Sequence, residues 1–356
     1  MRVSLLTIWH IGNYGAELQT YCTVQVLKEL GHHVRVVRYD LKESTQGNAS
    51  QLKQLLFNMI TGLMPANIKS QLFWNFHIPS TRKYNSPNDF YKNPPKADAY
   101  IVGSDQVWNP DITRESSPLY FLDFVPQGCK KISYASSFGE AEWKGDSNIT
   151  EIAKRNLLLF DNVSCRETSG VEILNKVFNI SAQCVLDPTL IVNDYSKLIG
   201  KVEEKNVLLY YPLNPNFEVE HFCKTLSKEL NLSLKIANKK TVLRRCMLWN
   251  KPSVIQWLKS IGEAKFIVTP SFHGLTTSIK LHRNFAILIT EPLILKRSAR
   301  VRDLLELLDL SDRLFTSIED LYASRIWEKN IDYCKVDNLL KIEREKSYKY
   351  LEDCLR

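Results

Sequence analysis

Short apolar segments of strand length alternate with segments of helix length along most of this 356-residue sequence. Residues 2–9 and 33–39 have the apolar composition of strands, and residues 16–30 between them show helical spacing that stops at Gly31. Strands joined through a helix run parallel, so the alternation predicts parallel sheets with helices on both faces. The other predicted strands are residues 97–103, 130–136, 162–166, 206–211, 232–237, 265–268 and 285–289. The other predicted helices are residues 51–76, 217–230 and 253–263, one that starts at 302, and an amphipathic tail at 338–354.

The chain is longer than the size at which a single hydrophobic core usually stops growing, so we expect two domains. The strand–helix pattern runs through both halves, and residues 193–206 join them. This organisation predicts an α/β protein of two Rossmann-like domains that face a cleft. The predicted limits are 1–197 for the N-terminal domain with a helical insertion at about 50–95, 198–330 for the C-terminal domain, and 331–356 for a helix that packs back on the body.

The composition excludes several classes of protein. Hydrophobic residues make up 44% of the sequence and charged residues 24%, as in folded globular proteins rather than disordered ones. The longest apolar runs are of strand length, and the N-terminus lacks the apolar core and the cleavage site of a secretion signal. The eight cysteines form no C-x-x-C pair, so we expect reduced thiols, no metal site and a cytoplasmic location.

The net charge of +8 is compatible with an anionic substrate or an anionic membrane surface. The densest basic stretches, 239–245 and 296–302, are not interleaved with the aromatic residues that a platform for single-stranded nucleic acid requires. We therefore expect no nucleic-acid partner.

One predicted strand end carries a histidine. An apolar segment, 264–268, stops at the turn 269–274, and a segment of helical character, 275–281, follows. The first turn of a helix offers backbone N–H groups and the positive end of the helix dipole, which suits an anion. His273 in this turn could hold a phosphate or a carboxylate, or move a proton near neutral pH. The alternative is that His273 only caps the helix.

Two further strand ends carry groups suited to a sugar, and ligands of parallel sheets bind at the carboxyl ends of strands. The segment 11–19 has two glycines before a helix, which let a ligand approach the backbone; the alternative is a turn needed only for packing. The segment 103–110 offers a carboxylate, two amides and an indole, which can bind a hydroxyl-rich ligand. The alternative there is a capping Asp105 and a packed Trp108.

The strand end at 164–170 carries Arg166, whose guanidinium is suited to forked binding of a carboxylate or a phosphate. A structural ion pair of Arg166 with Glu167 or Asp187 explains the same residue. The sequence alone is compatible with both roles of Arg166, ligand binding and a structural ion pair.

Six motifs in a fixed order give the sequence a family resemblance. They are Asn13-Tyr14-Gly15-Ala16 with Leu18-Gln19, residues 103–109, Ser133-Tyr134-Ala135, Arg166-Glu167, Asp187-Pro188-Thr189 and Ser271-Phe272-His273-Gly274. Over about residues 3–312 they resemble the polysaccharide pyruvyl transferase family. The resemblance implies a GT-B-like fold and transfer of pyruvate from phosphoenolpyruvate to a sugar, as a cyclic ketal and with release of phosphate. It implies no cofactor beside this donor, and a place in capsule or exopolysaccharide biosynthesis.

The resemblance also implies roles for individual residues. Arg166 and His273 would bind the donor, with His273 as the leading proton donor, and the backbone around Phe272 and Gly274 would help to hold the phosphate. The reaction further needs a base for the sugar hydroxyls, and we assign Asp105 as this base or as a ligand of a sugar hydroxyl. The residues expected to bind the acceptor with Asp105 are Gln106, Trp108, Asn109, Asn13, Tyr14, Gly15 and Gln19.

The sequence departs from the family pattern at Ser271, which stands among the donor-binding residues where some members carry an arginine that contacts the donor. Arg297 and Arg300, in the basic run after the next strand, are the expected replacements. Lys280 is less suited, because it lies about two turns into the helix. Pro270 also stands where many members with this motif carry an acid.

Two other functions remain open: a GT-B glycosyltransferase with a nucleotide-sugar donor, and a non-catalytic glycan-binding protein. The expected acceptor is a sugar of a bacterial surface polysaccharide or of its lipid-linked oligosaccharide precursor. A lipid-linked acceptor would bring the protein to the inner face of the membrane, where its positive charge and residues 51–76 could make peripheral contact. The sequence predicts no particular oligomeric state.

Overall fold

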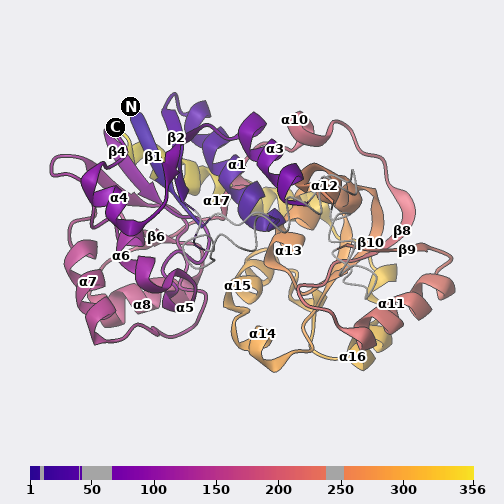
Figure 1. The fold of residues 1–356 in the computed structure, drawn as a ribbon. Coiled ribbons are helices and arrows are strands. Elements are labelled where there is room, and N and C mark those ends of the chain that lie inside the picture. The colour runs from indigo at the N-terminus through magenta and orange to yellow at the C-terminus, as the bar shows by residue number, and fades with distance from the viewer. Residues whose placement is uncertain (9–11, 40, 42–65, 238–251) are drawn as a thin grey trace, which may run out of the picture. The chain divides into compact units, whose positions relative to one another are not determined.

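The computed structural model describes residues 1–8, 12–39, 41, 66–237 and 252–356. The chain forms two compact units, and each contains a five-stranded parallel sheet (Figure 1). Unit 1 comprises Met1–Ile191 together with Glu343–Arg356, and unit 2 comprises Val192–Ile342. The predicted α/β class with parallel sheets is confirmed. The breaks at 191/192 and 342/343 compare with predicted breaks at 197/198 and 330/331.

The sheet of unit 1 has the strand order β3-β2-β1-β4-β5. Strands β1 and β4 are neighbours in the sheet but not in the chain, so the direction of winding reverses between them. Ligands of doubly wound sheets bind at such a reversal, outside the carboxyl ends of the two strands. The strands are β1 (Arg2–Leu6), β2 (His33–Tyr39), β3 (Ser80–Tyr84), β4 (Ala99–Val102) and β5 (Lys130–Ser133). The α-helices described in this unit before residue 192 are α1 (Tyr14–Glu29), α3 (Ala66–His77), α4 (Pro87–Lys92), α5 (Pro110–Thr113), α6 (Ser117–Tyr120), α7 (Ser147–Leu157), α8 (Thr168–Phe178) and α9 (Pro188–Ile191).

Helix α1 follows the signals that predict it. The side chain of Asn13 caps its start by accepting a hydrogen bond from the Ala16 backbone N–H at 3.2 Å. Lys28 lies in its last turn, where a cation is favourable beside the negative end of the dipole. Gly31 then adopts a φ of +83°, which glycine tolerates without steric cost, and the chain turns into β2.

Strand β3 lies inside the segment that the sequence predicts as a helical insertion. It pairs in parallel with β2 at the edge of the sheet, and its five residues are mostly polar and partly exposed. An edge strand of this kind lacks the apolar run that identifies a central strand, so the pattern gives no signal for it. Within the predicted helix 51–76, residues 66–76 are helical as part of α3, and residues 51–65 lie outside the described residues.

Two short strands follow the five-stranded sheet. β6 (Ser164–Cys165) pairs in parallel with β7 (Gln183–Cys184). Isolated bridges from Ile132 to Asn162 and from Ser136 to Cys165 link them to the segment around β5. The predicted strand 162–166 is therefore present in shortened form, and it brings Arg166 beside the loop that follows β5.

The sheet of unit 2 has the strand order β12-β11-β10-β8-β9, and its reversal of winding lies between β8 and β10. Helix α12 begins at a capping box in which Ser253 and Gln256 each bind the other's backbone N–H, as expected for a helix starting there. The strands are β8 (Lys205–Tyr210), β9 (Ser233–Ile236), β10 (Ala264–Thr269), β11 (Asn284–Leu288) and β12 (Leu314–Phe315). The α-helices described from residue 192 to α16 are α10 (Ser196–Ile199), α11 (Phe217–Glu229), α12 (Val254–Glu263), α13 (Phe272–Lys280), α14 (Pro292–Lys296), α15 (Ala299–Leu307) and α16 (Ile318–Ser324).

The last helix, α17 (Tyr333–Cys354), begins five residues before the predicted tail helix and contributes its final turns to unit 1. The Ser347 hydroxyl accepts a hydrogen bond from the Leu186 backbone N–H at 3.0 Å. The Tyr350 hydroxyl donates to the Ser133 carbonyl oxygen at 2.8 Å, at the end of β5. These buried bonds tie α17 to the carboxyl-end side of the unit 1 sheet. Within the part of the chain that the structure describes, every helix is too short or too polar to cross a bilayer.

Tyr350→Phe should lower the free energy of unfolding by about 1–2 kcal/mol, because it removes a buried donor and deprives the Ser133 carbonyl of one partner. Tyr348→Phe is the matched control, since Tyr348 lies on the same helix and its hydroxyl pairs with Glu29 at the surface. We expect the control to change stability by less than about 0.5 kcal/mol in chemical denaturation. Equal losses in the two variants would contradict this account of α17.

Candidate functional site

The predicted site residues lie at the carboxyl ends of the central strands, around the reversal of winding in each unit. In unit 1 they come from the start of α1, from the loop after β4 and from the end of β6. In unit 2 they come from the turn between β10 and α13 and from α14 and α15. We describe the two groups separately.

The loop after β4 turns closely against the loop after β5. Gly103 has a φ of +118°, and a Cβ atom there would lie 2.1 Å from the Tyr134 carbonyl oxygen, so only glycine fits. Asp105 has a φ of +77°, and its carbonyl oxygen accepts hydrogen bonds from the N–H groups of Val107 and Ser137. This backbone arrangement fixes the position of the Asp105 side chain.

Arg166 lies at the centre of a buried network of charges. Its side chain is 0% exposed, and its two terminal nitrogens bind Asp105 and Asp187, each at 2.9 Å. Its Nε lies 3.6 Å from a Glu167 carboxylate oxygen. Burial opposes the charge on Arg166, but the three carboxylates outweigh it and raise the pKa of Arg166 above its ordinary value. The structural pairing with Glu167 and Asp187 that the sequence left open is therefore present.

The carboxylates around Arg166 differ in their access to solvent. Asp187 is fully buried, and Thr189 donates to its second oxygen through both its backbone N–H at 3.0 Å and its hydroxyl at 2.7 Å. Ser104 donates its hydroxyl to the oxygen of Asp187 that also binds Arg166. The Asp105 side chain keeps 13% of its surface exposed, whereas that of Glu167 keeps 3%. Asp105 is thus the carboxylate of this network that a ligand can reach.

The remaining residues of the loop after β4 hold its shape. The Asn109 side chain caps α5 by accepting from the Asp111 N–H at 3.0 Å, and its amide donates to Gln106. Trp108 is 1% exposed, donates its indole N–H to the Tyr120 carbonyl oxygen at 2.9 Å and stacks on Phe121. Trp108 therefore supports the loop from the hydrophobic core. The acceptor contacts predicted for these residues stay predictions.

The start of α1 lies beside this loop. Gln19 is fully buried and donates to the Thr7 hydroxyl at 2.8 Å, and Thr7 in turn donates to the Ser104 carbonyl oxygen at 2.9 Å. This chain of bonds joins β1, α1 and the loop after β4. Asn13 is exposed at the helix start, whereas Tyr14 and Gly15 are buried. Among the predicted acceptor residues of α1, Asn13 is thus the most accessible side chain.

In unit 2, the turn after β10 is built on Thr269 and Ser271. The Thr269 hydroxyl donates to the Tyr211 carbonyl oxygen at 2.7 Å and accepts from the Ser271 N–H at 3.0 Å. The Ser271 hydroxyl then caps α13 by accepting from the Gly274 N–H at 3.2 Å. Gly274 is required for space, because a Cβ atom there would lie 2.9 Å from the Thr269 hydroxyl oxygen. Ser271 and Gly274 therefore shape the turn that carries His273.

His273 occupies the first turn of α13, half-buried, where the dipole favours a negative charge. Its ring meets the Phe272 ring edge to face, with centroids 5.4 Å apart. The Arg300 guanidinium lies over the other ring of this pair, 5.4 Å from the Phe272 centroid. Arg297 is more exposed, at the end of α14. Arg300, one of the two expected replacements for the missing arginine, is thus in contact with the histidine turn.

Sequence reasoning missed several contacts of the site. It did not identify Thr7 and Ser104 as partners of Gln19 and Asp187, nor the stacking of Arg300 on Phe272. The basic run 296–302 was the available signal for Arg300, whereas no local pattern indicates the serine and threonine contacts. Among the described residues, no group of three or more His, Cys, Asp or Glu side chains is arranged to hold a metal ion.

The topology and these strand-end sites define a GT-B-like α/β protein of two Rossmann-like units. A search of the curated proteins gave no match to the sequence. Among solved structures, UDP-GlcNAc 2-epimerase from Neisseria meningitidis bound to UDP-GlcNAc is 12% identical with a TM-score of 0.52, and the match covers 98% of this chain and 100% of the other. The S. aureus MnaA–UDP structure is 10% identical with a TM-score of 0.51, and the match covers 91% and 86%. At these identities the likeness shows the fold alone.

The sequence itself identifies the family. The family model described as polysaccharide pyruvyl transferase matches residues 13–292, which is most of the chain and includes the network around Arg166 and the turn that carries His273. The chain belongs to the polysaccharide pyruvyl transferase family and is therefore a transferase enzyme. The resemblance that six motifs suggested is confirmed.

Arg166→Leu should lower the free energy of unfolding by about 3–5 kcal/mol, because it leaves buried carboxylates without their cation. Arg155→Leu is the control, since Arg155 is exposed on α7 and its replacement should cost less than about 0.5 kcal/mol. Urea denaturation of both variants measures the difference. An Arg166→Leu variant as stable as wild type would contradict the network described above.

Gly274→Ala should destabilise unit 2 by about 1–3 kcal/mol although alanine favours helices, because the added Cβ meets the bonded Thr269 hydroxyl. Gly262→Ala is the matched control on α12. There the Cβ would lie 3.1 Å from a methyl group of Val202, which can shift. We expect the control to change the free energy of unfolding by less than about 1 kcal/mol, as measured by denaturant titration.

Proposed function

We propose that the protein transfers pyruvate from phosphoenolpyruvate to two hydroxyls of a sugar, forming a cyclic ketal and releasing phosphate. The acceptor would be a sugar of a bacterial surface polysaccharide, such as a capsule or an exopolysaccharide, or of its lipid-linked precursor. The observation that carries this proposal is the turn before α13, where His273 lies at a helix start and Arg300 stacks on the neighbouring Phe272. Membership of the family supports two parts of the proposal, the pyruvyl group that is transferred and the polysaccharide sugar that accepts it.

The donor is an anion, and the histidine turn offers what it requires. Phosphoenolpyruvate carries a phosphate and a carboxylate, which favour a helix start and a cation. The first turn of α13 supplies the dipole, His273 lies within it, and Arg300 lies beside it. Arg297, a few residues before Arg300, is a further cation for the same anion. These residues would do the work of the arginine that other members carry at the position of Ser271.

The reaction needs one proton at carbon and one at the leaving phosphate. In our proposal His273 gives a proton to the methylene carbon of the donor, which becomes a methyl group and leaves a cationic centre at C2. The first sugar hydroxyl attacks this carbon and loses its proton. The second hydroxyl then attacks and loses its proton as the C–O bond to phosphate breaks, and phosphate leaves as hydrogen phosphate. The two hydroxyl protons balance the one taken by carbon and the one taken by phosphate.

Asp105 is the proposed base for a sugar hydroxyl. It is the accessible carboxylate of its network. Its ion pair with Arg166 and the backbone conformation of Asp105, with a positive φ, fix the position of the carboxylate. Gln106 in the same loop and Asn13 at the start of α1 supply amides for further hydroxyls, whereas Asn109, which is buried and bonded within the loop, would hold the loop in shape. Trp108 would act through the position of this loop rather than by contact.

The contacts of Arg166 favour a positioning role. Direct donor binding, as the family resemblance implies, would require the guanidinium to exchange a carboxylate partner for the ligand, because its side chain is enclosed. A nucleotide-sugar donor is the alternative that the UDP-bound structural neighbours raise, but their likeness concerns the fold. A lipid-linked acceptor would bring the protein to the inner face of the membrane from the cytoplasm.

The test is phosphate release from phosphoenolpyruvate in the presence of candidate glycosides, together with calorimetric titration of phosphoenolpyruvate and of UDP-GlcNAc. His273→Gln should lower the rate of phosphate release by roughly 10²–10⁴-fold, as expected for loss of a general acid. Asp105→Asn should lower the same rate while the donor still binds. Arg300→Met should weaken donor binding by roughly 10–100-fold, as expected for loss of a charged hydrogen bond.

Arg325→Met is the control, since Arg325 is an exposed arginine of unit 2 that pairs with Glu328 outside the site. It should leave binding and turnover within about twofold of wild type. Binding of UDP-GlcNAc without binding of phosphoenolpyruvate would move the enzyme to the glycosyltransferase alternative. Glycan binding without any turnover would indicate the non-catalytic one.

A further inference from the structure

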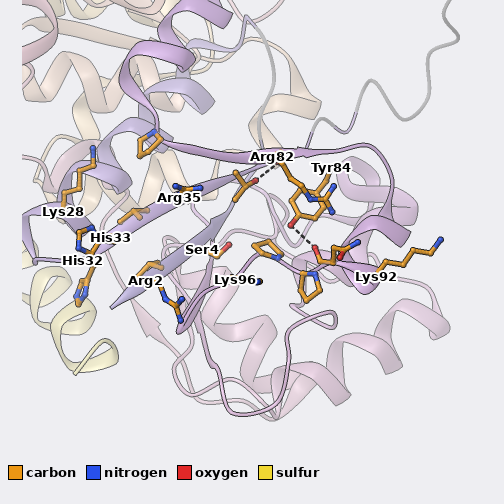
Figure 2. Close-up of a pocket in the computed structure, with 17 residues that line it drawn as sticks. Arg2, Ser4, Lys28, His32, His33, Arg35, Arg82, Tyr84, Lys92 and Lys96 are labelled. Carbon is orange, nitrogen blue, oxygen red and sulfur yellow. Dashed lines mark hydrogen bonds between the residues drawn. The ribbon is translucent and has the colours of Figure 1, made fainter.

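Unit 1 contains a hollow of about 1310 Å³ beside the amino ends of β1 and β2 (Figure 2). The residues that line it come from the first residues of β1 and β2, from β3, from the end of α1 with its following turn, and from residues 92–96 before β4. Five-residue β1 runs from this edge to the carboxyl-end edge, and at about 3.3 Å per residue the two edges are about 15 Å apart. Along β1 and β2 the hollow is therefore separated from the site at the carboxyl ends. On β3 its lining extends to Tyr84, which pairs with Tyr39, but β3 lies two strands away from β1.

The pairing of the strands brings basic side chains together. Arg2 pairs with His33 and Ser4 pairs with Arg35 in the parallel register of β1 and β2, so these four side chains share one face of the sheet. Arg82 comes from the neighbouring strand β3, and its guanidinium lies 4.3 Å from the centroid of the Tyr84 ring. Figure 2 shows these side chains around the hollow.

The lining of this basic hollow is positively charged. Among the described residues that line it none is an aspartate or a glutamate, and the basic ones are Arg2, Lys28, His32, His33, Arg35, Arg82, Lys92 and Lys96. Asp98, outside the lining, pairs with Arg2. Burial lowers the pKa of His32, which is therefore neutral at pH 7. The charges of Lys28, Lys92 and Lys96 are not paired with any described acid, so the hollow has an excess of positive charge.

The volume of the hollow and the chemistry of its lining restrict the kind of ligand that it can bind. Typical small-molecule pockets measure roughly 300–1,000 Å³, so this hollow is larger than one phosphate or one sugar requires. Its uncharged walls include Pro79, Pro94 and Pro95, whose rings offer apolar surface to the C–H faces of sugars. An elongated ligand with both anionic groups and apolar ring faces matches this combination.

We propose that the basic hollow binds a stretch of the acceptor polysaccharide that already carries carboxylates. The inference rests on the proposed function, in which each ketal keeps the carboxylate of pyruvate and turns the polysaccharide into a polyanion. Modified repeats then bind at the amino ends of the strands while further sugars reach the carboxyl ends. The hollow thereby holds the enzyme on the chain that it is modifying.

A polysaccharide fits these observations better than other polyanions. A membrane is flat and meets protruding charges, whereas these charges line a concavity. A single-stranded nucleic acid needs exposed aromatic rings for stacking, and Tyr84, the aromatic residue of the lining, is 3% exposed. Both remain outcomes of the test.

The experiment is a calorimetric titration of a hexamer of galacturonic acid, a carboxylate-bearing sugar chain, into the full-length protein. Replacing Lys28, Lys92 and Lys96 together by glutamine should weaken binding at least tenfold, and Arg35→Gln alone should weaken it severalfold. The matched control replaces Lys144, Lys154 and Lys176 by glutamine, which removes the same charge from exposed positions elsewhere on unit 1. We expect the control to bind within about twofold of wild type, maltohexaose to bind to neither, and binding to weaken with added salt.

Several results would overturn the proposal. Equal weakening in the two triple variants would show only an effect of net charge. Binding to phosphatidylglycerol vesicles or to oligothymidylate that depends on the three lysines, without binding of the hexamer, would assign the hollow to a membrane or a nucleic acid. Phosphate release from phosphoenolpyruvate measures turnover and therefore tests the proposed function, whereas binding of the hexamer tests this inference. A wild type that turns over but does not bind the hexamer refutes the inference alone, and one that binds but does not turn over refutes the proposed function instead.

Discussion

The ion network around Arg166 is the interaction on which the arrangement of the loop that carries Asp105 depends. A buried guanidinium is stable only if carboxylates surround it, and here they come from the loop after β4, the start of α8 and the segment before α9. One side chain therefore holds three strand ends in a fixed relation. The network contains more carboxylates than cations, and Asp105, the member that reaches solvent, is the one that our mechanism uses. The same group of charges thus stabilises the strand ends and contains the proposed base.

The turn before α13 follows a different physical principle. Hydroxyls of Thr269 and Ser271 shape it, and Gly274 leaves room for them. The charge for an anion comes from the helix dipole and from Arg300, a side chain that stacks on an aromatic ring and keeps part of its surface exposed. The two units therefore offer complementary chemistry, a carboxylate in one and a cationic helix start in the other.

The sequence predicted the α/β class, most central strands and the strand-end motifs, because apolar periodicity and glycine residues at turns are local signals. Ser253 and the helix it caps illustrate this. The edge strand β3 was missed because its polar residues carry no apolar run. The sequence named Glu167 and Asp187 as possible partners of Arg166 but not Asp105, which lies 61 residues away in sequence. The basic hollow was likewise hidden, because its charges come from separate strands and turns and meet only through the register of the sheet.

The division of unit 1 between the two ends of the sequence has a consequence for how the chain is made. The residues of α17 that bind Leu186 and Ser133 are synthesised after the whole of unit 2. Unit 2 is contiguous, so it can complete its contacts on the ribosome while unit 1 still lacks its last element. During translation, unit 1 is synthesised first but would be the last to complete its structure. Until then, Tyr134, Leu186 and Ser133 lack their contacts with α17, and the carboxyl-end side of the unit 1 sheet stays incomplete.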